Sequence, residues 1–458
     1  MRPLWQLTAA ELTRGFSTRQ FTPLDALDAC LARTAQVNPQ LNALVALDVD
    51  GATRAARLSG ERWQQRRALG LLDGIPVTVK DNLHLRGLPT RWGSRALPDI
   101  AAIADELPVA RLREAGAVLF GKTNVPEFTM QGYTDNLVFG VTRNPWNTAL
   151  TPGGSSGGAA ALVAAGGCPL AIATDGGGSI RRPASHTNLV GFKPSRGQVP
   201  RDRGMPPIFL DYEVVGPIAR CVDDVVAVMT VIGRGQTPVA ESPASLRILY
   251  IPQFAKHPVD SGIAQLTDVA ATQLAAMGHH VTRAEDFDLA EAVNAAWPRL
   301  SQAGLAWLVR HPQALSSAKL DAASFGAALQ ANEAAGAALS AVDLFDLLMH
   351  IETLKAEVAQ LFAPHDVLLT PAAAALPWPA AQSHPAHIAG QDVGPRGHAV
   401  FAAFANAAGL PAIALPCGFI DGLPVGLQLV AAEGADRLLL GLAQDFERQH
   451  PWHRFPDL

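Results

Sequence analysis

The sequence predicts an α/β protein in which a mixed, mostly parallel and twisted sheet is covered by helices on both faces, within one large domain. Two observations support this fold class. Short apolar runs typical of strands alternate with Ala- and Leu-rich helical stretches, and the turns between them are dense in Gly, Pro and Ser. The 458 residues are also 48% hydrophobic and 17% charged, which is enough apolar surface for a large buried core.

The first seventy residues indicate a helical segment. Thr8 and Glu11 have the spacing of a capping box, in which each side chain satisfies a free backbone N–H at the start of a helix. Thr22 and Pro23 have the residue types of an N-cap and a first-turn proline, so a second helix is expected to begin there. This segment is expected to serve as scaffold.

From Gly74 onward the pattern changes to strands alternating with helices. Helices are expected at 107–116 and 157–165, and most densely between 263 and 362. The Pro-rich stretch 371–395 is expected to be a loop, because strand and helix patterns resume after it. The apolar runs expected to form strands are 75–79, 117–120, 169–174, 246–251, 366–370, 411–415 and 425–430.

Charge and patterning exclude several classes of partner. The net charge is −5 and the densest basic stretch is only 62–67, so no nucleic acid partner is expected. The N-terminus lacks the apolar stretch of a signal peptide, and no segment has about 18 uninterrupted apolar residues, which predicts a soluble, cytoplasmic protein with no membrane contact. Four cysteines stand singly without C-x-x-C or clustered histidines, so buried reduced thiols and no metal or cofactor are expected.

The most informative local signal is a pair of serines flanked by glycines. Ser155 lies in Thr-Pro-Gly-Gly-Ser-Ser-Gly-Gly, and Ser179 follows 24 residues later in Asp-Gly-Gly-Gly-Ser-Ile-Arg. A nucleophilic serine needs an accessible hydroxyl, a base within hydrogen-bond reach and backbone N–H groups that can bind an oxyanion. Glycines 176–178 can turn successive N–H groups into one concavity, which makes Ser179 the candidate nucleophile.

Three other templates can be compared with these residues. Residues 153–157 satisfy the G-x-S-x-G nucleophile elbow, which requires an acid and then a histidine further along the chain. Histidines follow at 365, 384, 387 and 398, so the order of residues does not exclude this alternative. A phosphate-binding loop fails because no Gly-Lys-Ser/Thr follows the glycines. Ser316-Ser317-Ala318-Lys319 matches S-x-x-K, but no Ser-Asp-Asn follows it, so we treat the match as coincidence.

Taken together, the two serine motifs and Gly191-Phe192-Lys193-Pro194 resemble the amidase signature family. The resemblance covers about 70–235 and 366–430, whereas 240–365 has no matching motif. It implies one amidase signature domain over 1–458, with a helical N-terminal segment (1–70), a catalytic core (70–235), a helical variable region (240–365) and the C-terminal part of the core (366–458). The further matching blocks are 74–82, 121–124, 127–128, 144–146, 409–412 and 422–428.

The resemblance implies a catalytic triad of Lys80 as base, Ser155 as bridging serine after a cis peptide from Gly154, and Ser179 as the nucleophile that is acylated. It implies hydrolysis of a small carboxylic amide to the acid and ammonia or an amine, without cofactor or metal, and a homodimer. The oxyanion hole would consist of the backbone N–H groups of Gly176, Gly177, Gly178 and Ser179. Met130, together with Gln131 and Tyr133, is expected to line the pocket for the acyl group, and the variable region is expected to complete it.

The chemistry of the triad sets a physical requirement for Lys80. A lysine of ordinary pKa near 10.4 would have to lose its proton at neutral pH, at a cost of roughly 4.6 kcal/mol. Burial disfavours the charged form and can lower a lysine pKa by about 3 to 5 units. Lys80 is therefore predicted to be buried and largely neutral, while Asp175 and Arg181 are expected to fix the nucleophile loop by hydrogen bonds.

Two rival functions remain. The glutamine-hydrolysing component of a tRNA-dependent amidotransferase, its A chain, would show an Arg-rich segment, but 339–362 has the pattern of a plain amphipathic helix, which favours a free-standing amidase. A catalytically inactive binding protein on the same fold would have a misplaced or charged Lys80. One departure from the family pattern is Gly176, where many relatives carry threonine or a bulky aliphatic residue.

Overall fold

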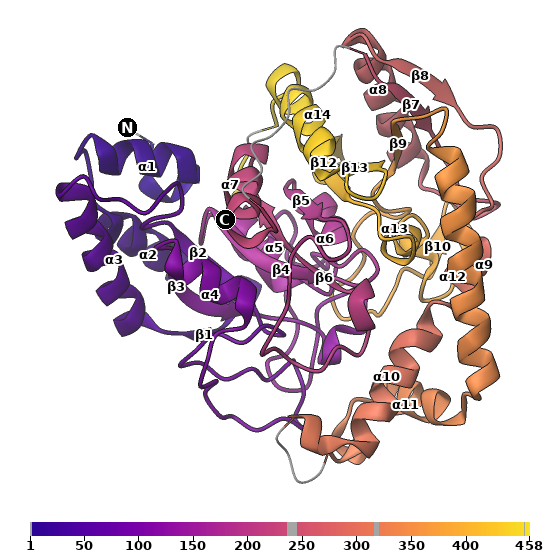
Figure 1. The fold of residues 1–458 in the computed structure, drawn as a ribbon, viewed down its shortest axis with the longest axis horizontal. Helices are drawn as coiled ribbons and strands as arrows, with labels where there is room; N and C mark the ends of the chain where they lie inside the picture. The colour runs from indigo at the N-terminus through magenta and orange to yellow at the C-terminus, as the bar shows by residue number, and fades with distance from the viewer. Residues whose placement is uncertain (1, 236–244, 316–319, 453) are drawn as a thin grey trace.

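An 11-stranded sheet forms the centre of the molecule, with strand order β1-β3-β2-β4-β6-β5-β12-β13-β9-β7-β8 (Figure 1). The computed structural model describes residues 2–235, 245–315, 320–452 and 454–458. A separate two-stranded ribbon consists of β10 (His387–Ile388) and β11 (Gln391–Asp392), within the stretch expected to be a loop. The strands of the large sheet are β1 (Leu44–Leu47), β2 (Pro76–Lys80), β3 (Val118–Thr123), β4 (Leu170–Asp175), β5 (Val190–Lys193), β6 (Val214–Ala219), β7 (Arg247–Tyr250), β8 (His280–Arg283), β9 (Val367–Pro371), β12 (Ala412–Ile420) and β13 (Leu423–Ala431).

The mixed α/β sheet is confirmed, but the expectation that it is mostly parallel is wrong. β2 runs parallel to β3 and β4, and β7 runs parallel to β8 and β9. The other six pairings in the described sheet are antiparallel, including the long hairpin of β12 and β13. Strands buried on both faces have similar apolar runs in either direction, so the sequence pattern did not determine their orientation.

The N-terminal segment contains three α-helices and one strand. The sequence pattern did not predict the strand. The expected capping box is present, with the Thr8 hydroxyl accepting from Glu11 N–H, and the expected N-cap Thr22 forms a second one, with its hydroxyl accepting from Asp25 N–H. The four residues of β1 form an edge of the sheet, antiparallel to β3. An apolar run this short cannot be told from a helical segment by periodicity. The helices are α1 (Ala9–Ser17), α2 (Pro23–Leu41) and α3 (Val49–Gln64).

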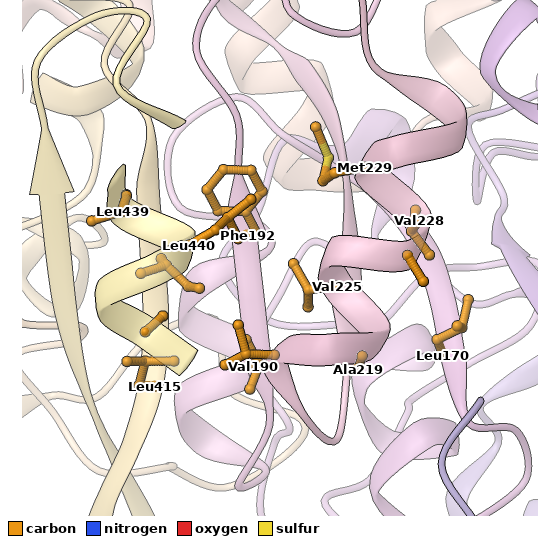
Figure 2. Packing of buried hydrophobic residues seen from close by; sticks show 14 of the residues in the cluster. Leu170, Val190, Phe192, Ala219, Val225, Val228, Met229, Leu415, Leu439 and Leu440 are labelled. Carbon is orange, nitrogen blue, oxygen red and sulfur yellow. The ribbon is translucent and has the colours of Figure 1, made fainter. Parts of the chain in front are cut away.

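One face of the sheet is covered by α1, α4, α7, α8 and α14, whose buried side chains form a continuous apolar core with the strands. Figure 2 shows Val225 of α7 and Leu440 of α14 on either side of Phe192 of β5. α8 packs at the far end of this face beside β7, β8 and β9 (Figure 1). The helices not yet given bounds are α4 (Leu107–Glu114), α7 (Val222–Ile232), α8 (Ser261–Ala276) and α14 (Asp436–Gln449).

The opposite face carries two further groups of helices. α2, α3, α5 and α6 form a core with the strands on the β1 side, and α9 to α13 form another core towards β9 and β7. Alternate residues of β4 serve both faces: Leu170 and Ile172 point to one core, whereas Ala171 and Ala173 point to the other. The helices introduced here are α5 (Gly157–Ala164), α6 (Arg181–His186), α9 (Glu291–Ala296), α10 (Pro298–Arg310), α11 (Ala327–Ala338), α12 (Ala341–Leu361) and α13 (Ala403–Ala407).

The lengths and compositions of the described helices bear on whether any of them could span a membrane. No single one is long and apolar enough to span a membrane, and α11 and α12 pass the criterion of length and composition only as a pair bent by 98°. The Ser316-Ser317-Ala318-Lys319 motif lies outside the described residues.

Candidate active site

Lys80 is the last residue of β2, a strand in which every residue is buried. The amine of Lys80 is itself buried and is hydrogen-bonded to three oxygens of two residues. Its Nζ lies 2.8 Å from Ser155 Oγ, 2.9 Å from Thr174 Oγ1 and 3.1 Å from the carbonyl oxygen of Thr174. β2 and β4 are parallel neighbours, so their carboxyl ends bring Lys80 and Thr174 to the same edge of the sheet.

The environment of Lys80 favours the neutral amine. Burial lowers the pKa of Lys80 to about 7, although the carboxylates of Glu213 and Asp175 act in the opposite direction. The predicted burial of Lys80 is confirmed. A pKa of about 7 leaves roughly half of the molecules with a neutral Lys80 at pH 7, so the amine is largely neutral only above about pH 8.

Ser155 is held immediately before α5 by tight backbone packing. The peptide bond between Gly154 and Ser155 is cis, as the family resemblance implied. Two residues later, α5 begins, and a Cβ on Gly158 would lie 2.4 Å from Asn124 N, so this helix approaches the end of β3 very closely. The N–H of Ser156 donates to the carbonyl of Ser179 over 3.2 Å, which connects the two serine loops.

Ser179 follows β4 and precedes α6. It is 8% exposed and lies in the wall of a cavity of about 440 Å³. Within the part of the chain that the structure describes, its hydroxyl makes no hydrogen bond, including none with Ser155. The structure therefore joins Lys80 to Ser155 directly, and the Ser156 N–H joins the Ser155 loop to Ser179, which lies in the cavity wall.

The carboxylate of Asp175 shapes the nucleophile loop. It accepts hydrogen bonds from the N–H groups of Gly177 (3.2 Å) and Gly178 (2.7 Å). It also pairs with Arg181 at 2.9 Å, with both side chains fully buried. Burial alone would raise the pKa of Asp175, but the Arg181 guanidinium holds it well below its usual range. The predicted loop-fixing contact between Asp175 and Arg181 is thus present.

These bonds change the expected composition of the oxyanion hole. Of the four predicted donors, the N–H groups of Gly177 and Gly178 are already bonded to Asp175. Among described residues, the N–H groups of Gly176 and Ser179 have no acceptor. Trp297 helps to fix the orientation of the Gly176 backbone, because its Nε1 donates to the carbonyl of Gly176 over 3.0 Å. Gly176 and Ser179 therefore carry the free donors next to the nucleophile.

A second group of polar side chains supports this loop from behind. The Asn406 side-chain amide donates to the carbonyl of Asp175 over 2.8 Å, and its oxygen accepts from Arg181 over 2.7 Å. Arg181 also donates to Gln428 Oε1 over 2.7 Å. These partners come from α13 and β13, more than 220 residues along the chain, so the loop is anchored to the C-terminal part of the sheet.

The walls of the cavity come from four parts of the chain, within 129–133, 176–213, 297–332 and 383–398. Met130, Gln131 and Tyr133 line it, as expected, and so do Gly176 and Gly177. Gly154 and Gly178, which were predicted to bind substrate or oxyanion, are not in the described wall; the carbonyl of Gly154 instead accepts from Arg182 over 3.2 Å. The region without matching motifs contributes Trp297, Pro298, Ser301, Gln302, Ala328 and Asn332, so its expected place at the pocket is confirmed.

A family model and known proteins match nearly the whole chain. The model of the Amidase family matches residues 25–440. This chain belongs to the amidase signature family. A curated relative, the A chain of the glutamyl-tRNA(Gln) amidotransferase of Symbiobacterium thermophilum, is 32% identical over 98% of this chain and 97% of its own length. The corresponding protein of Pseudomonas syringae pv. tomato is 33% identical over 98% of both chains.

Solved structures of amidase signature proteins share the fold over nearly the full chain. A bacterial aryl acylamidase of this family superimposes with a TM-score of 0.88 at 30% identity, covering 97% of this chain and 96% of its own. A 6-aminohexanoate cyclic dimer hydrolase bound to its substrate gives a TM-score of 0.89 at 28% identity, covering 99% of both chains. The chain is thus an enzyme of an amide-hydrolysing family.

Several residues of this amidase site were not found from the sequence. Thr174 directly precedes Asp175 in the recognised motif, so a polar residue at the end of β4 was an available signal. Trp297 gave no signal because it lies in the region without matching motifs, and Arg396 gave none because it lies outside the matching blocks at 409–412 and 422–428. Outside the site, Lys122 pairs with Asp81 at 3.1 Å. Within the described part of the chain, no group of three or more His, Cys, Asp or Glu side chains could hold a metal ion.

Proposed function

We propose that this chain hydrolyses a small carboxylic amide to the acid and ammonia or an amine, through an acyl-enzyme on Ser179. The observation that carries the proposal is the 2.8 Å contact between the Nζ of Lys80 and the hydroxyl of Ser155, at a lysine whose burial lowers its pKa to about 7. A buried lysine that is neutral near physiological pH is a base, and its bonding partner lies in a loop that is hydrogen-bonded to Ser179 in the cavity wall.

The first half of the reaction forms an ester on the nucleophile. Ser179 Oγ passes its proton to Ser155 Oγ, which passes its own proton to the neutral amine of Lys80. The Ser179 oxygen attacks the amide carbonyl carbon, and the resulting oxyanion accepts from the free N–H groups of Gly176 and Ser179, a type of donor typically worth roughly 3 kcal/mol. Catalytic hydrogen bonds commonly tighten when substrate binds, which accounts for a relay whose second contact is still open here.

The second half releases both products. The proton returns from Lys80 through Ser155 to the amide nitrogen, the C–N bond breaks, and ammonia or an amine leaves. Water then attacks the Ser179 ester while its proton enters the same relay. Collapse of the second tetrahedral intermediate returns that proton to Ser179 Oγ and frees the carboxylic acid. The relay therefore serves as base and acid in turn.

The geometry argues against an inactive binding protein. That rival requires a Lys80 that is misplaced or permanently charged. Here the Lys80 amine faces Ser155, and its three oxygen partners include no carboxylate that would hold the charge.

A glutamine-hydrolysing component of an amidotransferase is the second candidate, because the curated relatives at 31–33% identity carry that name. Against it, α12 contains one lysine and no arginine, so the Arg-rich element expected of that component is missing from this described helix. We therefore favour a free-standing amidase. The two candidates differ in whether the chain alone releases ammonia from simple amides.

The test is release of ammonia or amine by the purified chain on aliphatic, aryl and amino-acid amides, including glutamine. We expect turnover by the chain alone and a loss of at least about a thousandfold in Ser179→Ala, because the nucleophile is removed. Ser156→Ala is the matched control and should stay within about tenfold of the parent, since the Ser156 hydroxyl only donates to the Thr174 carbonyl. Release from glutamine only after addition of partner proteins would instead identify the amidotransferase.

Several properties remain predictions from the sequence. They are the cytoplasmic location, the absence of nucleic acid and membrane partners, the homodimer, the absence of a cofactor, and the segment boundaries at 70, 235, 240 and 365.

A further inference from the structure

The cavity beside Ser179 holds two arginines that have no carboxylate partner. Arg396, in the loop before α13, is partly buried, and its guanidinium forms no hydrogen bond or ion pair with any described residue. Its Nη2 would be 3.8 Å from a Cβ placed on Gly177, so the charge lies directly over the nucleophile loop. Arg182 of α6 contacts only neutral groups: the carbonyls of Gly178 (3.3 Å) and Gly154 (3.2 Å) and the ring of His398 (3.2 Å).

The other titratable groups in the cavity wall do not neutralise this charge. Glu213 is the acidic residue of the described wall, and its carboxylate is bound by Arg201 at 2.7 Å, with 9% of its side chain exposed. His398 is neutral near pH 7, because burial and the adjacent Arg182 lower its pKa well below its ordinary value. The part of the wall next to Gly177 is therefore positive without compensation.

This arrangement opposes the stability of the protein. Burial and the charge of Arg396 lower the pKa of Arg182 to about 9, and burial lowers that of Arg396 to about 10. An uncompensated buried charge costs free energy of folding, and such costs concentrate at sites that receive a ligand of opposite charge. A guanidinium presents N–H donors in a planar fork that matches a carboxylate.

We infer that the substrate is an amide that carries a carboxylate a few bonds from the scissile bond, and that Arg396 binds this carboxylate while Arg182 strengthens the local positive field. The inference rests on the proposed amidase function and specifies its substrate class. It names Arg396 as a specificity-determining residue for the pocket.

The same wall disfavours a substrate with an additional positive charge. An α-ammonium group beside the carboxylate would need an acidic partner, and Glu213 is already bound by Arg201. Glutaramate, the monoamide of a five-carbon dicarboxylic acid, should therefore bind better than glutamine, which differs from it only by the α-ammonium group. Pentanamide, in which a methyl group replaces the carboxylate of glutaramate, should bind worst because it leaves Arg396 unpaired.

The first test measures binding, which does not depend on turnover. Ser179→Ala would be titrated calorimetrically with glutaramate, glutamine and pentanamide, and with the shorter pair succinamate and butyramide. We expect at least one carboxylate-bearing amide to bind about 10 to 100 times more tightly than its uncharged match, as expected for a charged hydrogen bond. Adding Arg396→Gln should remove this preference, whereas Arg396→Lys should keep part of it because the charge remains.

The matched control is Arg54→Gln, which removes an exposed arginine of α3, outside the cavity wall. It should leave the preference for the anionic amide unchanged. The inference would be overturned if Ser179→Ala bound each anionic amide no more tightly than its uncharged match. It would also be overturned if a folded variant that adds Arg396→Gln kept the preference for the anionic amide. Tighter binding of glutamine than of glutaramate would also contradict it.

Turnover by the parent chain separates this inference from the proposed function. Ser179-dependent hydrolysis with equal kcat/KM for glutaramate and pentanamide would support the amidase function and contradict the carboxylate site. Binding of carboxylate-bearing amides through Arg396 without hydrolysis of any amide would support the carboxylate site and contradict the proposed hydrolysis.

Discussion

At the scale of single residues, the three oxygen partners of Lys80 indicate which protonation state the site is built for. The Thr174 carbonyl can only accept, and the Thr174 hydroxyl can donate to Glu213 over 3.3 Å, which leaves its lone pair for the amine. A neutral amine has two N–H donors and one lone pair. Two bonds to Thr174 therefore leave the lone pair of Lys80 for the Ser155 hydroxyl, the direction that a general base requires.

The pKa of Lys80 predicts the dependence of the reaction on pH. Only the neutral amine accepts a proton, so kcat/KM should rise with pH through about 7 and level off above it. At pH 6 it should be about tenfold below the plateau. Lys80→Met should lower kcat/KM by at least about a thousandfold and remove this rise. The measurement is a pH profile from about 5.5 to 9.5 on an uncharged amide, and a profile that falls as pH rises through 7 would contradict a neutral Lys80 base.

The residues of the triad could be predicted from the sequence because each lies in a short motif with distinctive neighbours. The sequence could not show which backbone N–H groups of the nucleophile loop are free to bind an oxyanion. The glycines of 176–178 look alike in the sequence, and only the position of the Asp175 carboxylate shows that Gly177 and Gly178 are occupied while Gly176 is free. Arg396 reaches the site from 217 residues beyond Ser179, and nothing in its local sequence indicates a binding residue.

At the scale of elements, helix starts were predictable and strand directions were not. The side chains that cap α1 and α2 belong to the first turn of the same helix, so sequence spacing alone reveals them. β5 and β6, which were not among the strands expected from the sequence, both run antiparallel to their neighbours. The close approach of α5 to β3 also depends on tertiary packing, through glycines that the sequence presented only as part of a turn-like motif.

The glycine at position 158 offers a test of that packing. A Cβ there would lie 2.4 Å from Asn124 N, 2.6 Å from its carbonyl oxygen and 2.7 Å from the carbonyl oxygen of Ala43, all of them backbone atoms that cannot rotate away. Gly158→Ala should therefore lower the free energy of unfolding by about 1 to 3 kcal/mol or more. Urea unfolding followed by circular dichroism measures this change.

Gly60→Ala is the matched control, because Gly60 also lies within a helix, α3, but its added Cβ would meet only Pro23 Cδ at 3.8 Å. This variant should be neutral or more stable by up to about 1 kcal/mol, since alanine favours the helix. Equal effects of the two substitutions would refute the proposed close packing of α5.

At the scale of the whole molecule, the catalytic chemistry and the substrate pocket come from different parts of the chain. Lys80, Ser155 and Ser179 stand at or beside the carboxyl ends of β2 and β4, the third and fourth strands from the β1 edge of the large sheet. The variable side of the cavity is provided by Trp297, α10, α11 and the loop before α13, to one side of that sheet (Figure 1). Family motifs therefore predicted the reaction, whereas the identity of the substrate depends on elements that the motifs do not cover.

The most direct measurement of the central claim is covalent labelling with a fluorophosphonate, followed by peptide mapping, because it tests the nucleophile without knowledge of the substrate. We predict one label on Ser179, absent in Ser179→Ala, and labelling at least about a hundredfold slower in Lys80→Met, since the relay activates the hydroxyl. A label on Ser155, or labelling of Ser179 at the parent rate in Lys80→Met, would contradict a nucleophile activated through Ser155 and Lys80.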